Sequence, residues 1–74
     1  MDREFERIVG QRIRQRRESL GLTQDQLSAQ FQINGCDLTR SALAKIEVGQ
    51  RHIYPDELRL FRKLLAISYD ELLY

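Results

Sequence analysis

Residues 23–47 read TQDQLSAQFQINGCDLTRSALAKIE, and this stretch predicts two short helices joined by a turn. Thr23 is a favourable N-cap, and Gln26 stands three residues later, which is the spacing of a capping box. The Asn-Gly pair at 34–35 tolerates a positive φ and therefore marks the end of the first of these helices. We expect that helix over about residues 24–32.

The second helix of the stretch is expected over about residues 40–47, with Thr39 as its N-cap. Leu43 and Ile46 lie three residues apart and share an inward face. The other faces carry Arg40, Ser41 and Lys45. A short helix that presents small polar and cationic side chains suits the major groove of DNA.

Gln24 stands in the first turn of the first helix, beside unpaired backbone N–H groups and the positive end of the helix dipole. Both features favour a phosphate as a neighbour. The plain alternative is that Gln24 is a polar residue in an exposed turn.

Length and composition favour one small all-α domain. The chain has 74 residues, one proline and four glycines, and helix-forming residues dominate it. No apolar run approaches the length of a membrane span, and the charged start of the chain is not a signal peptide. Cys36 has no internal partner for a disulfide, so we expect a reduced thiol in a cytoplasmic protein.

The sequence predicts no enzyme, no metal site and no cofactor. One histidine, one cysteine and scattered carboxylates form no recognisable catalytic constellation and cannot complete a zinc site. Nothing near Cys36 in the sequence favours a low thiol pKa, so a passive loop thiol is expected in preference to a redox switch.

The distribution of charge says more than the formal net charge of +1. Residues 11–52 hold seven Lys or Arg against four Asp or Glu, whereas residues 55–74 hold three against four. The basic excess therefore surrounds the two-helix stretch. Charge alone supports a polyanion-binding surface and an ordinary solvated surface equally.

A long helix is expected before this stretch, from a cap at Asp2 to about Leu20. Its apolar stripe is marked by Phe5, Ile8, Val9, Ile13 and Leu20. Arg17 falls on the same stripe, where a cation must find a partner or extend to solvent. The arginine run 12–17 is either a DNA-facing patch or, as we favour for most of it, a solvated helix face.

Two further helices are expected after the stretch. Pro55 suits the first turn of one, whose buried face would comprise Leu58, Phe61, Leu64 and Leu65. Ser68 and Glu71 form a capping box for a last short helix.

Three segments together resemble a known family: RIRQRRESLGLTQDQL, SALAKIEVGQR and LLAISYDELL. The combination resembles the Cro/CI-type (XRE) helix-turn-helix family of phage and bacterial repressors. The resemblance covers residues 8–73, with the motif at about 23–47, and leaves residues 1–7 as the start of the first helix. It implies a compact five-helix lambda-repressor-like domain whose second and third helices bind DNA.

The resemblance also implies roles for individual residues. Thr23 and Gln24 match the turn that sits on a backbone phosphate, and Arg51 matches a loop that often touches the backbone. Arg17 and Glu47 match a buried salt bridge between the first and third helices. The positions that face bases or nearby phosphates are matched by Thr39, Arg40, Ser41 and Lys45.

One departure from the family pattern lies between Leu27 and Leu38, which are eleven residues apart, where about six is usual. Either the second helix extends toward Ile33 or the extra residues loop out. The choice among Thr39, Arg40 and Ser41 as base readers stays open for the same reason.

The leading hypothesis is sequence-specific binding of double-stranded DNA by a small bacterial or phage transcriptional regulator, most simply a repressor. The alternative is a helix-turn-helix module that binds another regulator or a toxin. A homodimer is the usual form for palindromic sites. The C-terminal Leu72, Leu73 and Tyr74 either form its contact or complete the monomer core.

Overall fold

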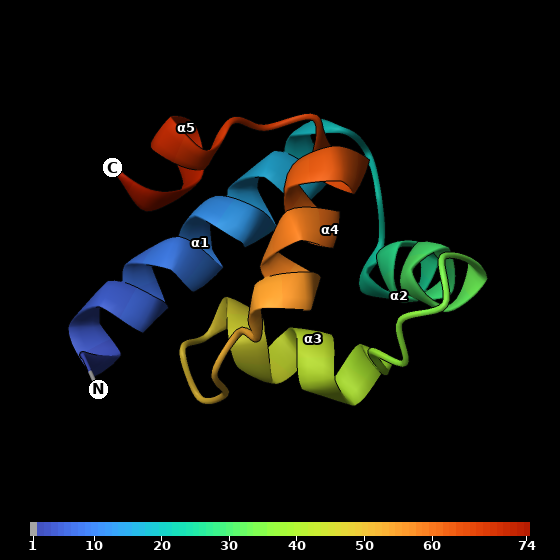
Figure 1. Ribbon diagram of the computed structural model, residues 1–74, viewed down its shortest axis with the longest axis horizontal. Coiled ribbons are helices and arrows are strands. Elements are labelled where there is room, and N and C mark those ends of the chain that lie inside the picture. The colour runs from blue at the N-terminus through green and yellow to red at the C-terminus, as the bar shows by residue number, and fades with distance from the viewer. Residues whose placement is uncertain (1) are drawn as a thin grey trace.

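The computed structural model describes residues 2–74 and consists there of five helices without a strand (Figure 1). They are α1 (Arg3–Ser19), α2 (Gln24–Ile33), α3 (Arg40–Glu47), α4 (Pro55–Leu65) and α5 (Tyr69–Leu73). The prediction of a five-helix, all-α fold is confirmed. Met1, the first residue of the segment expected to begin the first helix, lies outside the described residues. No helix in residues 2–74 is long and apolar enough to cross a membrane.

The N-caps that the sequence predicts are formed. Thr23 Oγ1 accepts a hydrogen bond from the Gln26 backbone N–H at 3.1 Å, and the Gln26 side chain accepts one from the Thr23 N–H at 2.8 Å. The other predicted caps are Asp2 on α1, Thr39 on α3 and Ser68 on α5. These four helices therefore begin where a side chain can satisfy a first-turn backbone donor, whereas α4 begins with Pro55, which has no backbone N–H.

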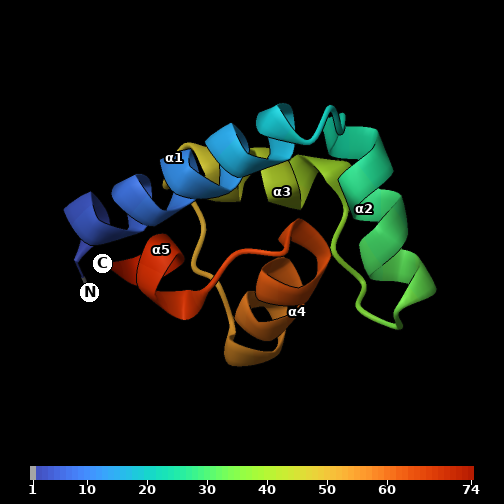
Figure 2. The ribbon, with the colours of Figure 1, turned by 90° about the horizontal axis from the view of Figure 1, so that it is seen from above.

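The helices enclose one core. Figures 1 and 2 show α1 along one side of the molecule and α3 lying across α1. The same views show α2 at the end of the molecule away from both termini. Fully buried side chains come from every helix, and Phe31 of α2 meets Phe61 of α4 with ring centroids 4.6 Å apart. The buried apolar cluster comprises Val9, Ile13, Leu27, Phe31, Leu38, Leu43, Ile46, Phe61, Leu65, Ile67 and Leu72.

Gly10 allows α1 to lie directly on α3. A Cβ at this position would collide with the carbonyl oxygen of Ile46 and would lie 3.0 Å from that of Glu47. The two backbones therefore touch at the last turn of α3, with no side chain between them. This contact places α3 close to α1 and turns its remaining face to solvent.

The expected stripe of α1 needs two corrections. Val9 and Ile13 are buried, but Phe5 and Leu20 are both largely exposed. Leu20 is the C-cap, one residue beyond the end of α1. Phe5 lies in the first turn, where it lines an open apolar pocket with Val9, Ile53, Leu58 and Leu73.

The α2–α3 connection settles how the extra residues are accommodated. α2 reaches Ile33, one residue beyond the expected end, and residues 34–39 then form the connection. Leu38 is fully buried, and its carbonyl oxygen accepts hydrogen bonds from Ser28 Oγ at 2.9 Å and Gln32 Nε2 at 3.0 Å. The longer turn is thus anchored to α2 immediately before α3 begins.

Candidate nucleic-acid interface

The outward face of α3 carries the polar residues that the sequence singles out. Thr39, Arg40, Ser41 and Lys45 are exposed, while Leu43 and Ile46 are buried. Within residues 2–74, neither Ser41 nor Lys45 has a side-chain hydrogen bond or ion pair, so both are available to a partner. The small side chain of Ala44, between Ser41 and Lys45 on this face, lets another molecule approach the helix closely.

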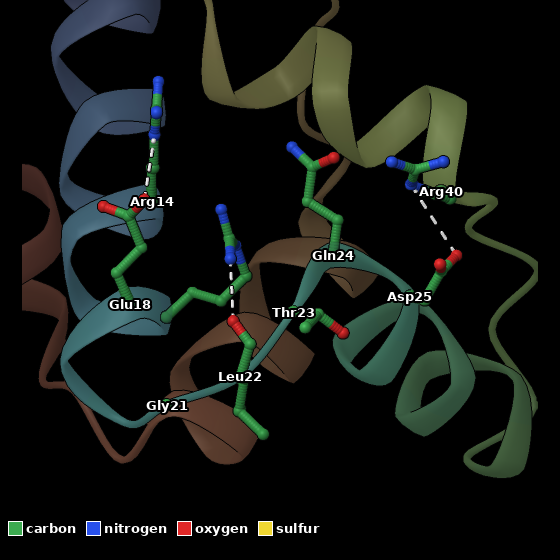
Figure 3. A pocket seen from close by; sticks show the side chains of 9 residues that line it. Arg14, Glu18, Gly21, Leu22, Thr23, Gln24, Asp25 and Arg40 are labelled. Carbon is green, nitrogen blue, oxygen red and sulfur yellow. Dashed lines mark hydrogen bonds and ion pairs between the residues drawn. The ribbon is translucent and has the colours of Figure 1, made fainter.

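An open pocket lies beside this face, between the end of α1, the first turn of α2 and the start of α3 (Figure 3). It holds charges of both signs. Arg14 Nε lies 3.4 Å from Glu18 Oε2, and Arg40 Nε lies 3.7 Å from Asp25 Oδ1. Its lining residues are Arg14, Arg17, Glu18, Gly21, Leu22, Thr23, Gln24, Asp25 and Arg40.

Arg17 and Glu47 meet at the base of this region. Arg17 Nε donates to Glu47 Oε2 at 2.7 Å and Nη2 donates to Oε1 at 3.0 Å, with the side chains 8% and 1% exposed. A third hydrogen bond joins Arg17 Nη1 to the carbonyl oxygen of Leu22 at 2.7 Å. The hydrogen bonds that Arg17 donates to Glu47 raise the pKa of Arg17, so the guanidinium stays charged. This bidentate pair ties α1 to the last residue of α3.

Gln24 joins the same carboxylate, which the sequence analysis did not foresee. Its Nε2 donates to Glu47 Oε1 at 3.0 Å, and Figure 3 shows its amide turned toward α3. Glu47 therefore accepts hydrogen bonds from α1 and from α2 while belonging to α3. A Gln amide nitrogen carries two hydrogens, so one donor of Gln24 is left for another acceptor.

Arg51 lies outside the pocket of Figure 3 and is held by a residue that the sequence analysis missed. Its Nη1 and Nη2 donate to Glu57 Oε1 and Oε2 at 2.8 and 3.0 Å, and this pairing raises the pKa of Arg51. The Glu57 side chain is only 6% exposed. Its place three residues into α4, where it also accepts from the Tyr54 N–H, was a readable capping signal. Its burial had no signal in the sequence.

The arginines of the run 12–17 in α1 make different contacts. Arg12 donates to the carbonyl oxygens of Leu72 and Tyr74 at 3.1 and 3.4 Å. Arg16 donates to those of Leu65 and Ala66 at 2.8 and 3.3 Å. These two side chains satisfy the C-terminal carbonyls of α5 and α4. Because Arg17 is buried against Glu47, only Arg14 of the four remains on an exposed face near α2 and α3.

Among residues 2–74, the remaining reactive groups build no second site. Burial raises the pKa of the Cys36 thiol, with a further contribution from the charges of Asp56 and Glu57. A raised thiol pKa disfavours the nucleophilic thiolate, which agrees with a passive role. His52 Nδ1 lies 2.6 Å from Glu6 Oε2 on the surface. The described part of the chain holds no cluster of three or more His, Cys, Asp or Glu that could bind a metal ion.

Comparison with known proteins gave one match. A family model described as a helix-turn-helix domain matches residues 10–74, and that family is typical of XRE-type regulators. The match therefore covers most of the chain, including all of α2, α3, α4 and α5. Comparisons with curated proteins and with solved structures found no match.

Proposed function

The chain belongs to the helix-turn-helix domain family, and from that premise we propose that it binds double-stranded DNA as a small transcriptional regulator. The observation that carries the proposal is the division of α3 into two faces. Its inner face is locked to α1 and α2 through Glu47, whereas Ser41 and Lys45 project outward without partners in the described residues. A rigid helix with a free polar face is what reading a major groove requires.

The proposed contacts follow from the placement of the helices. The N-terminal end of a recognition helix points toward the base edges, so Thr39, Arg40 and Ser41 would lie nearest to them, with Lys45 one turn further along. Thr23 and Gln24 would hold a phosphate at the first turn of α2. Arg51 would reach a neighbouring phosphate with the N–H groups that neither Glu57 nor the carbonyl oxygen of His52 accepts.

Repression by occupying an operator is the simplest mechanism for such a domain, acting in the cytoplasm of a bacterium or of a phage-infected cell. A homodimer on a palindromic site is the form we propose. Leu72 is fully buried and completes the monomer core, so it cannot be the dimer contact. Tyr74 is exposed and Leu73 half-buried, which leaves these two residues for that role.

One specific observation favours a second candidate. Asp25 and Glu18 place negative charge beside the proposed phosphate site, and the net charge of the chain is only +1. This surface also suits a protein partner, so a helix-turn-helix module that binds another regulator or a toxin is the alternative function.

Selection of bound sequences from random duplex DNA, followed by binding measurements at several salt concentrations, tests the proposal. We expect an enriched palindromic site. The slope of log affinity against log salt should be about −2 to −3 for each chain, because Arg14, Lys45 and Arg51 are the cations placed to neutralise phosphates. No enrichment together with a slope near zero would reject DNA binding in favour of the protein-interaction function.

A further inference from the structure

Asp25 occupies an unusual place for an acidic residue on a DNA-binding surface. It is the second residue of α2, and its carboxylate points toward Arg40 at the start of α3 (Figure 3). Oδ1 of Asp25 lies 3.7 Å from Nε of Arg40, and the two side chains are 75% and 65% exposed. The ion pair therefore joins the first turn of α2, which is proposed to hold a phosphate, to Arg40, which is proposed to contact a base.

A carboxylate offers a guanidinium the same kind of anionic oxygen that a phosphate offers. In the free protein, Asp25 therefore competes with DNA for Arg40. It also places a negative charge where a backbone phosphate would approach the first turn of α2. Both effects weaken contacts that any duplex can make, whatever its sequence.

We propose that Asp25 is a specificity-determining residue that acts through Arg40. It engages Arg40 through Nε, which holds the guanidinium away from phosphates while Nη1 and Nη2 stay free for a base edge that accepts two parallel hydrogen bonds. Guanine is the base that offers two such acceptors, O6 and N7, in the major groove. Affinity for generic DNA is thereby kept low while affinity for the preferred site is largely retained, which widens the difference between them. This inference rests on the proposed DNA-binding function.

A simpler role for Asp25 must be separated from this one. An acidic residue in the first turn of a helix stabilises that helix through its dipole. Asp70 provides the matched control, because it is the second residue of α5, is also exposed, and does not line the pocket of Figure 3. Asp70→Asn removes the same charge from the same helical position, so it reproduces the dipole and net-charge effects without the Arg40 contact.

The experiment compares wild type, Asp25→Asn, Arg40→Ala, the double variant and Asp70→Asn on a generic duplex and on the selected site. Circular dichroism first establishes that each variant is folded. Asp25→Asn should bind generic DNA about three- to fivefold more tightly at low salt, the scale set by an exposed ion pair. Its salt slope should steepen by about one unit, because Arg40 becomes free to neutralise a phosphate. The ratio of specific to generic affinity should fall by about the same factor.

The gain should disappear when Asp25→Asn is combined with Arg40→Ala, and Asp70→Asn should show none of these changes. An equal gain in the Arg40→Ala background would overturn the proposal, because Asp25 would then act by repulsion alone. Unchanged generic binding by Asp25→Asn, or an equal gain from Asp70→Asn, would also overturn it. A wild-type chain that binds no duplex at all would instead reject the proposed function, and the inference with it.

Discussion

At the scale of single residues, we expect the Glu47 carboxylate to affect the free energy of unfolding more than any group on the outward surface does. It accepts hydrogen bonds from Arg17 and Gln24 and is almost completely buried. Removing Arg17 alone, for example as Arg17→Met, should lower the free energy of unfolding by about 3–5 kcal/mol, because a buried carboxylate loses its counter-charge. Replacing both residues with apolar side chains of similar volume should cost much less. Urea denaturation of the two single variants and the double variant measures the coupling.

Absence of coupling between positions 17 and 47 would contradict this interpretation of the pair. The pH dependence gives a second check. Because pairing raises the pKa of Arg17 in the folded state, its contribution is fully present below the ordinary arginine pKa. That contribution is lost only as the pH rises through the raised value, in strongly alkaline solution. Stability measured between neutral and moderately alkaline pH should therefore show no loss from this group.

Arg51 should behave first as a structural residue. Arg51→Ala leaves the buried Glu57 carboxylate without its bidentate partner, so we expect a loss of about 1–3 kcal/mol, discounted because Arg51 itself is partly solvated. Thermal unfolding measures it, with Arg59→Ala on the exposed side of α4 as the control. A stable Arg51→Ala variant would show that Glu57 is easily rehydrated. Effects of this variant on DNA binding are interpretable only at temperatures where it is fully folded.

Arg40 is the residue whose substitution separates base reading from phosphate binding. If it contacts a guanine, Arg40→Ala should lose discrimination at one position of the half-site, worth about 1–3 kcal/mol, with a modest fall in general affinity. A panel of single-base operator variants measures this loss. A uniform weakening across the panel, with the preference intact, would assign Arg40 to the backbone.

Sequence reasoning succeeded for residues whose partners are local or whose burial breaks a pattern. Arg17 and Glu47 could be paired because Arg17 interrupts an apolar stripe and both positions match a salt bridge of the family that the sequence resembles. Thr23 and Gln26 could be paired because the capping box has a fixed spacing. Arg12 and Arg16 could not be placed, since their acceptors are backbone carbonyls 49 to 62 residues away. A backbone carbonyl is present at every residue, so such a contact leaves no trace in the amino-acid pattern.

At the scale of the helices, the crossing of α1 over α3 depends on the absence of a side chain at Gly10. Gly10→Ala should destabilise the fold by about 1–3 kcal/mol, because the added methyl group collides with the α3 backbone at Ile46. This loss should appear although alanine favours a helix over glycine by about 1 kcal/mol. Urea denaturation checks it, with Gln11→Ala on the exposed face as control. A stabilised Gly10→Ala variant would mean that the two helices separate easily.

The positions of the helices could be predicted from sequence patterns, but the path of the α2–α3 connection could not. The helices could be located because their caps and glycines are local signals, and the structure moves the end of α2 by a single residue. The path of the α2–α3 connection could not be predicted. It depends on Leu38 entering the core and on Ser28 and Gln32 holding its carbonyl, which are contacts made only after the chain has folded back.

At the scale of the whole molecule, one core and several long-range ties predict a single cooperative unfolding transition. Every helix contributes to the same buried cluster, and Arg12 and Arg16 fasten the ends of α5 and α4 to α1. The chain has three tyrosines and no tryptophan, so tyrosine fluorescence reports mainly on residues after α3. Urea transitions followed by fluorescence and by far-UV circular dichroism should coincide. Separate midpoints would show that α4 and α5 detach before the rest.

The free outward face of α3 also bears on how such a protein changes over evolutionary time. The buried cluster includes none of the exposed residues Arg40, Ser41 and Lys45. Their neighbours Leu43 and Ile46 belong to that cluster and are packed against the core. Under the proposed function, mutations on the two sides of this helix are subject to separate selection, one side for target preference and the other for folding. A lineage could acquire a new target by drifting through variants at three positions, all of them equally well folded. The same separation makes these positions the natural ones to randomise in a library of altered specificity.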